Sequence, residues 1–102
     1  MSDYLDEDGY PTEEALKRIE EWPHGDWLAM LEFAYPLWSY PDRWWIEGEV
    51  LHLSTGGWSG NEDIIRAMEQ NRIFWALCWI QSRRGGHYQL DLSRVKEMEK
   101  VE

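Results

Sequence analysis

The stretch Trp44-Trp45-Ile46-Glu47-Gly48-Glu49-Val50-Leu51-His52-Leu53 is the part of this 102-residue chain that decides its fold class. Two runs rich in aromatic and β-branched residues flank Glu47-Gly48-Glu49, and this pattern predicts a β-hairpin with a short glycine-containing turn. The second run leads into a glycine-rich segment and then into a helical pattern, so we expect the hairpin to belong to a mixed α and β domain.

Two helices are predicted before the hairpin, the first of them amphipathic. Thr12 is a good N-cap, and the two glutamates after it suit the positive end of a helix dipole. Pro23 should end this first helix. Asp26 can cap a second, strongly apolar helix, which Pro36 should kink or end.

A third helix, over about residues 60–71, is predicted after the hairpin. Ser59 as N-cap and Glu62 three residues later fit a capping box. The segment Ile73–Ile80 fits either an extension of this helix or a new strand. Its aromatic and β-branched content, with Asn71 as a helix stop, favours the strand.

The C-terminal part is predicted to form a turn, a strand and a short helix. Arg84-Gly85-Gly86 would turn the chain into a last strand over residues 87–92, and Ser93 can cap a charged tail. The order α-α-β-β-α-β-β then predicts an α+β fold, with about three helices on one face of a small antiparallel sheet of about four strands.

The domain organisation follows from this order. Residues 1–9 are expected to be a mobile, acidic lead-in, and residues 10–92 a single α+β domain. Residues 93–102 are expected to be the short charged tail. Eight tryptophans can supply much of the core, although not all of them can be fully buried in a domain of this size.

The charge of the chain is concentrated in its first half. Residues 1–51 hold 13 acids and 3 bases, and residues 52–102 hold 7 of each, so the net charge of −10 comes from the first half. An acidic face repels nucleic acid and anionic membranes and favours basic protein surfaces. The alternative is that the acids only keep an aromatic-rich protein in solution.

Cys78 is the only cysteine of the chain. A single cysteine allows no intramolecular disulfide, so nothing requires an oxidising compartment. Its apolar neighbours predict an inert core thiol rather than a nucleophile. The N-terminus has no apolar signal region and no apolar run is long enough to span a bilayer, so we expect a cytoplasmic protein.

Two glycine-rich runs form the candidate ligand- or partner-binding surface, because glycines let backbone N–H groups approach another molecule closely. The first run joins a strand to a helix N-terminus, which favours an anion, but its spacing is neither the Walker nor the dinucleotide pattern. A packed turn with Trp58 over the core and a surface for a protein partner are the alternatives. The candidate residues are Ser54, Thr55, Gly56, Gly57, Trp58, Ser59, Gly60, Asn61, Glu62, Arg83, Arg84, Gly85, Gly86, His87 and Tyr88.

Few of these side chains indicate a definite chemistry. Arg83-Arg84 could hold a phosphate or carboxylate, or serve as internal counter-ions. Glu62 fits a cap, a partner of the arginines or an acid/base, and His87 fits a general base or an ordinary strand histidine. His24 and His52 have no metal-ligand spacing with His87, so neither a metal site nor a cofactor is predicted.

A set of distinctive segments is spread over residues 10–92. They are Tyr10-Pro11-Thr12-Glu13-Glu14, Leu37-Trp38-Ser39-Tyr40-Pro41-Asp42, Ser54-Thr55-Gly56-Gly57-Trp58-Ser59-Gly60-Asn61-Glu62, Phe74-Trp75, Cys78-Trp79 and Ser82-Arg83-Arg84-Gly85-Gly86-His87-Tyr88. Together these segments resemble a family of small uncharacterised proteins of phages, prophages and bacteria. The resemblance implies a small accessory protein of mobile elements, where anti-defence inhibitors are common.

Three functions remain in competition. The first is a non-enzymatic, phage-type accessory protein whose acidic face, with the glutamates of residues 13–21, blocks a basic surface of a host protein. The second is a module that binds a small nucleotide-like anion at the two glycine runs, which must then meet in space. The third is a small hydrolase or transferase with His87 or Glu62 as base. A homodimer through a sheet edge or exposed tryptophans is compatible with each.

Overall fold

The computed structural model describes residues 4–23, 25–83 and 86–99. The predicted α+β class is confirmed, and the order of the later elements differs from the prediction. In chain order, the described elements are α1 (Glu13–Glu20), α2 (Trp27–Ala34), the 3-10 helices η1 (Tyr35–Leu37) and η2 (Pro41–Arg43), β1 (Trp44–Glu47), β2 (Val50–Ser54), α3 (Ser59–Gln70), α4 (Arg72–Cys78), β3 (Trp79–Arg83), β4 (His87–Asp91) and α5 (Ser93–Met98).

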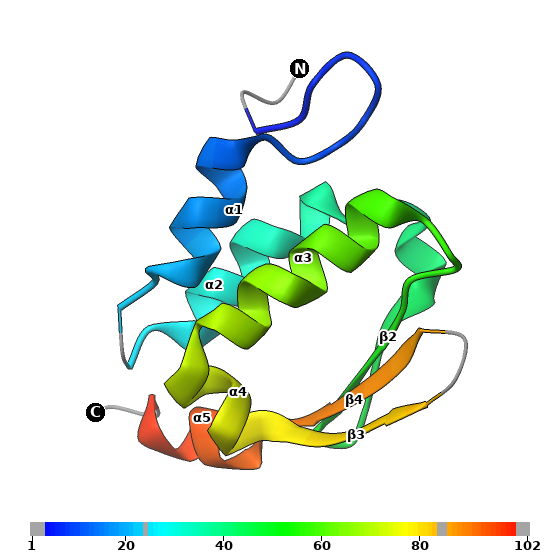
Figure 1. Ribbon diagram of the computed structural model, residues 1–102. Helices are drawn as coiled ribbons and strands as arrows, with labels where there is room; N and C mark the ends of the chain where they lie inside the picture. Colours follow the sequence, from blue (N-terminus) through cyan, green and yellow to red (C-terminus); the bar gives the residue numbers. More distant parts are fainter. Residues whose placement is uncertain (1–3, 24, 84–85, 100–102) are drawn as a thin grey trace.

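The four described strands form one sheet in the order β1-β2-β4-β3, with every neighbouring pair antiparallel. Side chains alternate between the two faces of β2, so Leu51 and Leu53 are buried together with Leu90 of β4. His52 and its cross-strand neighbour Gln89 lie on the opposite face. Helices α1, α2 and α3 lie on the same side of the sheet (Figure 1). None of the described helices covers the other face, which we call the open face.

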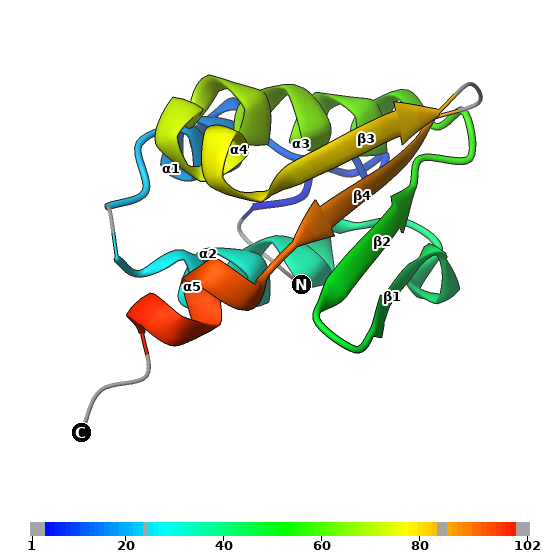
Figure 2. The ribbon, with the colours of Figure 1, turned by 90° about the horizontal axis from the view of Figure 1, so that it is seen from below.

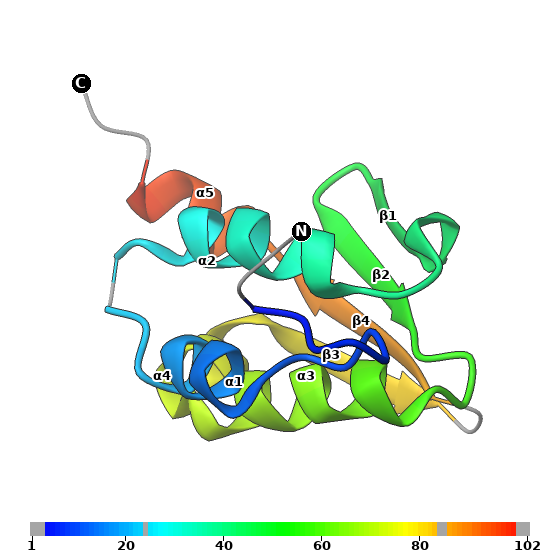
Figure 3. The ribbon, with the colours of Figure 1, turned by 90° about the horizontal axis from the view of Figure 1, so that it is seen from above.

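The hydrophobic core lies between the sheet and the helices. Figures 2 and 3 show α3 and α2 as two layers beside the sheet, with α5 running along α2. Trp27 and Trp38 are buried, whereas Trp45 and Trp79 are exposed, as expected for a small domain with many tryptophans. The largest fully buried side chains are Trp27, Phe74, Ile19, Met30, Leu51, Leu53, Ile64, Ile65, Met68, Leu90, Leu92 and Val95.

The starts of the first two helices follow the predicted positions. The Thr12 side chain accepts a hydrogen bond from the Ala15 amide at 3.2 Å, which confirms the predicted N-cap. Asp26 occupies the N-cap position of α2, but its carboxylate accepts from Trp22 Nε1 at 3.2 Å and makes no cap bond. The chain then leaves α2 at Ala34, immediately before the predicted proline break.

The predicted capping box at the start of the third helix is wrong. The N-cap of α3 is Trp58, whose carbonyl accepts from the Glu62 amide at 3.1 Å, and no side chain caps this end. The helix therefore starts one residue earlier than predicted. The Ser59 hydroxyl is directed at Tyr10 Oη, 3.4 Å away, rather than back onto the helix.

The strand predicted from Ile73 is also wrong, because the segment first forms α4 and becomes a strand only at Trp79. Phe74 and Cys78 are four residues apart and both fully buried, which is the spacing of one helix face. Asn71 does end α3, as predicted, and α4 follows it directly. Burial against the neighbouring elements overrides the strand propensity of this segment.

The tail also begins differently from the prediction. The N-cap of α5 is Leu92, not Ser93, and the Asp91 carboxylate accepts from the Ser93 amide at 2.9 Å. The hydrogen bonds from Ser93 lower the pKa of the Asp91 carboxyl. At the other end of the chain, residues 4–9 of the expected lead-in belong to a loop closed by a bridge between Leu5 and Pro11.

No described helix combines the length and the hydropathy that are needed to cross a membrane.

Candidate functional site

The structure brings the two predicted glycine runs together. The Thr55 amide donates to the Gly86 carbonyl at 2.9 Å, and Ser54 lies opposite His87 in the sheet. Arg84 and Gly85 lie outside the described residues, and Arg83 is described only as the strand position paired with His87. The runs are therefore adjacent, as an anion-binding module requires.

The first run forms a tight turn that uses its own amide groups. The Trp58 amide donates to the Thr55 carbonyl at 3.0 Å, and the Gly57 amide lies 3.3 Å from Thr55 Oγ1. Gly56 and Gly57 have φ values of 63° and 76°, the two consecutive positive values of a type I′ turn. These glycines serve the turn, and the amides of Gly57 and Trp58 are engaged within it.

Asn61 connects this turn to the loop after α2. It is fully buried, with 0% of its surface exposed. Its Oδ1 accepts from the Ser39 amide at 2.9 Å, and its Nδ2 donates to the carbonyls of Ser39 at 3.0 Å and Thr55 at 3.3 Å. These bonds use the amide to join two backbone segments, so its role in the structure is architectural.

The aromatic residues of the two runs pack onto the domain. Trp58 stacks on Tyr10 with ring centroids 4.6 Å apart, and Gly60 provides the space that this ring needs. Tyr88 lies on the helix-facing side of β4, and its ring and that of Trp75 form a T-shaped pair with centroids 6.2 Å apart. Burial raises the pKa of Tyr88, and the nearby acids, including Glu62, raise it further.

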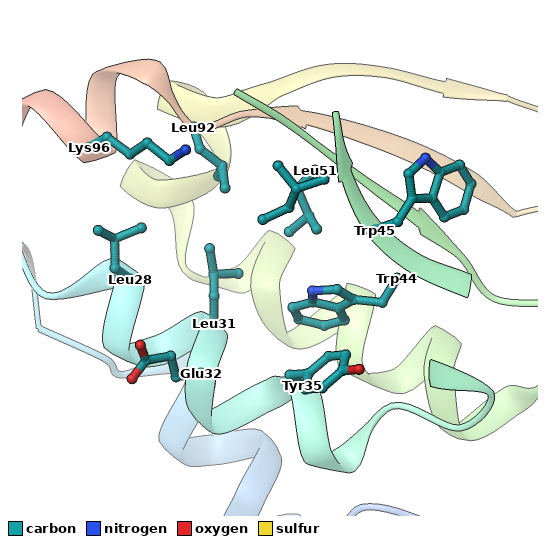
Figure 4. Close-up of a pocket in the computed structure, with 10 residues that line it drawn as sticks. Leu28, Leu31, Glu32, Tyr35, Trp44, Trp45, Leu51, Leu92 and Lys96 are labelled. Atoms are coloured by element: carbon teal, nitrogen blue, oxygen red, sulfur yellow. The ribbon is translucent and has the colours of Figure 1, made fainter. Parts of the chain in front are cut away.

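A separate apolar groove lies between α2, α5 and the β1–β2 hairpin. Its volume is about 570 Å³. In Figure 4, Leu31, Leu51 and Leu92 point toward one another, Trp44 points inward beside Tyr35, and Trp45 points away. Three separate parts of the chain therefore build this groove.

The border of the groove includes exposed apolar side chains. Ile46 is 53% exposed and Tyr35 44% exposed. Both border the groove beside β1, which has β2 as its partner on one side and forms an edge of the sheet. Exposed aromatic and aliphatic groups beside a free strand edge are typical of a protein-binding surface.

Carboxylates lie beside this groove. Glu32 lines it on α2, and a neighbouring recess that shares Leu28 and Lys96 with it is lined by Glu49, Glu97 and Glu99. Glu99 is engaged in a helix cap, since its Oε2 accepts from the Trp27 amide at 2.6 Å. Among the described residues that line the two hollows, Lys96 is the one base.

A second cluster lies on the open face of the sheet. His52 Nδ1 and His87 Nε2 are 3.3 Å apart, and His52 Nε2 lies 3.1 Å from Glu47 Oε1. The ring of Trp45 is parallel to that of His52, with centroids 4.9 Å apart and an interplanar angle of 4°. Of these four side chains, only His87 is among the site residues predicted from the sequence.

One sequence signal for this cluster is the alternation of apolar and polar residues along β2, which places His52 on the face opposite Leu51 and Leu53. Pairing of β2 with β4 is needed to bring His87 beside it, and no local pattern specifies that pairing. The groove could not be found from the sequence for the same reason, because its walls come from elements far apart in the chain.

Cys78 has the environment predicted for an inert core thiol. It is fully buried, and burial, followed by the charges of Asp91 and Glu99, raises its pKa to about 12. A thiol that stays protonated is a poor nucleophile.

Comparison with protein-family models finds no match, and searches of curated proteins and of solved structures find none either.

Proposed function

We propose that this protein is a non-enzymatic binding protein that holds an extended, basic segment of a partner protein in the groove. The observation that carries the proposal is an apolar groove with a free strand edge on one side and carboxylates beside it. The strand edge allows main-chain pairing with an extended segment, and the groove allows apolar contact. The carboxylates attract basic side chains.

The strand edge is the argument for an extended partner. A peptide that adds to β1 pairs its backbone with the free N–H and C=O groups of this edge. Trp44 and Ile46 face the groove side, whereas Trp45 and Glu47 face the open side. The added strand would follow the same alternation, with every second side chain toward the groove and the carboxylates beside it.

The charges are the argument for a basic partner. Glu32, Glu49 and Glu97 form no ion pair within the described residues, and each is exposed. Their attraction for lysine or arginine is available to another molecule, and it would increase the association rate most at low salt. The resemblance to small phage and bacterial proteins supports a host protein as the partner, with inhibition of a defence effector as the outcome.

The test is peptide binding measured by fluorescence polarisation. The probe is a labelled peptide of alternating valine and lysine, and its control replaces each lysine with glutamate. We expect Glu32→Lys/Glu97→Lys to weaken binding of the lysine peptide about tenfold at low salt, because two exposed charge pairs of about 0.5–1 kcal/mol each are reversed.

The matched control is Glu13→Lys/Glu20→Lys. It makes the same change of charge on α1, which does not line the groove. Equal loss in both double variants would show that only net charge matters and would contradict the groove. Equal affinity for the lysine and glutamate peptides would contradict a basic partner.

A small anionic ligand at the two glycine runs is the second candidate function, and the Thr55–Gly86 hydrogen bond that joins the runs favours it. A thermal-shift screen with phosphate and nucleotides tests it, because a ligand that binds the folded state raises Tm. A rise in wild type that is absent in Arg83→Ala/Arg84→Ala supports this module. A flat screen contradicts it.

A further inference from the structure

We propose that His52 and His87 bind a zinc ion on the open face of the sheet. His52 Nδ1 and His87 Nε2 face each other at 3.3 Å. Two histidine nitrogens that bind one tetrahedral zinc at about 2.0–2.1 Å lie about 3.3–3.4 Å from each other. The fold therefore holds the two nitrogens at the separation of neighbouring zinc ligands.

Glu47 and Trp45 orient the His52 ring for this role. Its Nε2 is 3.1 Å from Glu47 Oε1, and donation of this N–H to the carboxylate leaves the lone pair on Nδ1, the atom that faces His87. Histidine ligands commonly make such a bond to a carboxylate, which fixes the ring and raises its basicity. Trp45 lies flat against the same ring.

The sheet places both ligands on neighbouring central strands. His52 lies opposite Gln89, and His87 lies two residues before Gln89 on β4, so the two histidines are diagonal neighbours on one face. Ligands held on paired strands lose little freedom when they bind an ion. Zinc requires a lone pair on Nε2 of His87, so this ring must carry its proton on Nδ1.

The described residues supply two of the four ligands of a tetrahedral zinc ion. Within the described residues, no group of three or more histidine, cysteine or acidic side chains is placed to hold a metal. Water, or a donor atom of another molecule, would therefore complete a tetrahedral ion. This arrangement predicts an exchangeable zinc rather than a closed structural site.

The test is isothermal titration of tag-free protein with zinc chloride. We expect one zinc per chain in wild type, and affinity lowered at least about tenfold in both His52→Gln and His87→Gln because each variant removes one of two ligands. Glu47→Gln, which keeps both ligands, should weaken binding about tenfold, and Glu49→Gln on the same hairpin should not. His24→Ala removes the third histidine of the chain and should leave the affinity unchanged.

Circular dichroism melts establish that each variant is folded at the temperature of titration. Wild-type affinity in either His52→Gln or His87→Gln overturns the proposal, as does the absence of zinc binding to the wild type. Loss of affinity in His24→Ala alone would assign zinc to another place and would also overturn it. His52→Gln and His87→Gln leave the groove residues and the carboxylates beside the groove unchanged, so the result from these two variants is independent of the proposed peptide binding.

Discussion

Asn71 Nδ2 lies 3.0 Å from the carbonyl oxygen of Ile19, so the junction of α3 and α4 caps the end of α1. The same amide lies 3.3 Å from the Trp22 carbonyl, and Asn71 is only 5% exposed. A side chain between two helices therefore satisfies backbone groups of a third helix more than 45 residues earlier in the chain.

The Asn71→Ala variant should lower the free energy of unfolding by about 1–3 kcal/mol, because carbonyls at the end of α1 lose a buried hydrogen-bond donor. Urea unfolding followed by tryptophan fluorescence measures the change. The control is Gln70→Ala at the exposed neighbouring position, which should stay within about 0.5 kcal/mol of wild type. Equal effects of the two substitutions would show that the amide contacts do not stabilise the fold.

The Glu99→Gln variant should destabilise the protein by about 0.5–2 kcal/mol. Glu99 accepts from the amides of Trp27 at 2.6 Å and Leu28 at 3.2 Å, so its negative charge lies at the positive end of α2. Glu97→Gln removes the same charge from an exposed position nearby and serves as the control. If chemical denaturation gives both variants the same midpoint, capping of α2 by Glu99 is not a source of stability.

The Gly86→Ala substitution should lower the free energy of unfolding more than Gly48→Ala does. Both glycines have positive φ values, 82° and 62°. Alanine is strained in this conformation, so either substitution should lower the free energy of unfolding by about 1–2 kcal/mol. At Gly86 the added methyl would also overlap the Thr55 side chain, whereas the space at Gly48 is open. The overlap should add about 1–3 kcal/mol in urea unfolding. If Gly86→Ala lowers the free energy of unfolding no more than Gly48→Ala does, the two glycine runs separate easily.

Cys78 should make the protein less stable at alkaline pH. Its folded-state pKa is about 12, whereas an unfolded thiol loses its proton near about pH 8.5. The folded state therefore binds the proton more tightly, so this stabilisation is complete below about pH 8.5 and is lost as the pH rises toward 12.

The measurement is the free energy of unfolding of wild type and Cys78→Ala between about pH 8 and 11. At the lowest pH of this range the alanine variant should have the smaller free energy of unfolding, because the substitution leaves a cavity. Its free energy of unfolding should then fall less steeply as the pH rises. The raised pKa of Tyr88 acts in the same direction in both proteins, so it cancels in the comparison. Identical slopes would show that the thiol does not couple folding to pH.

The sequence by itself determined the local elements whose signals are contiguous. Thr12 defined the start of α1, the proline after Tyr35 defined the end of α2, and Gly48 with its flanking strands defined the hairpin. These features depend on backbone geometry and on neighbours a few residues away, which is why propensities and capping rules predict them. The α+β class followed from their order.

The tertiary structure alone decided the elements and surfaces that depend on distant partners. The segment after Asn71 became α4 because Phe74 and Cys78 are buried together, and its strand propensity was overridden. His52 met His87 only through the pairing of β2 with β4, and α2, β1 and α5 form the groove only when the domain is assembled. The physical reason is that side-chain alternation assigns a residue to a face of the sheet, whereas packing of the whole core determines which residues share that face.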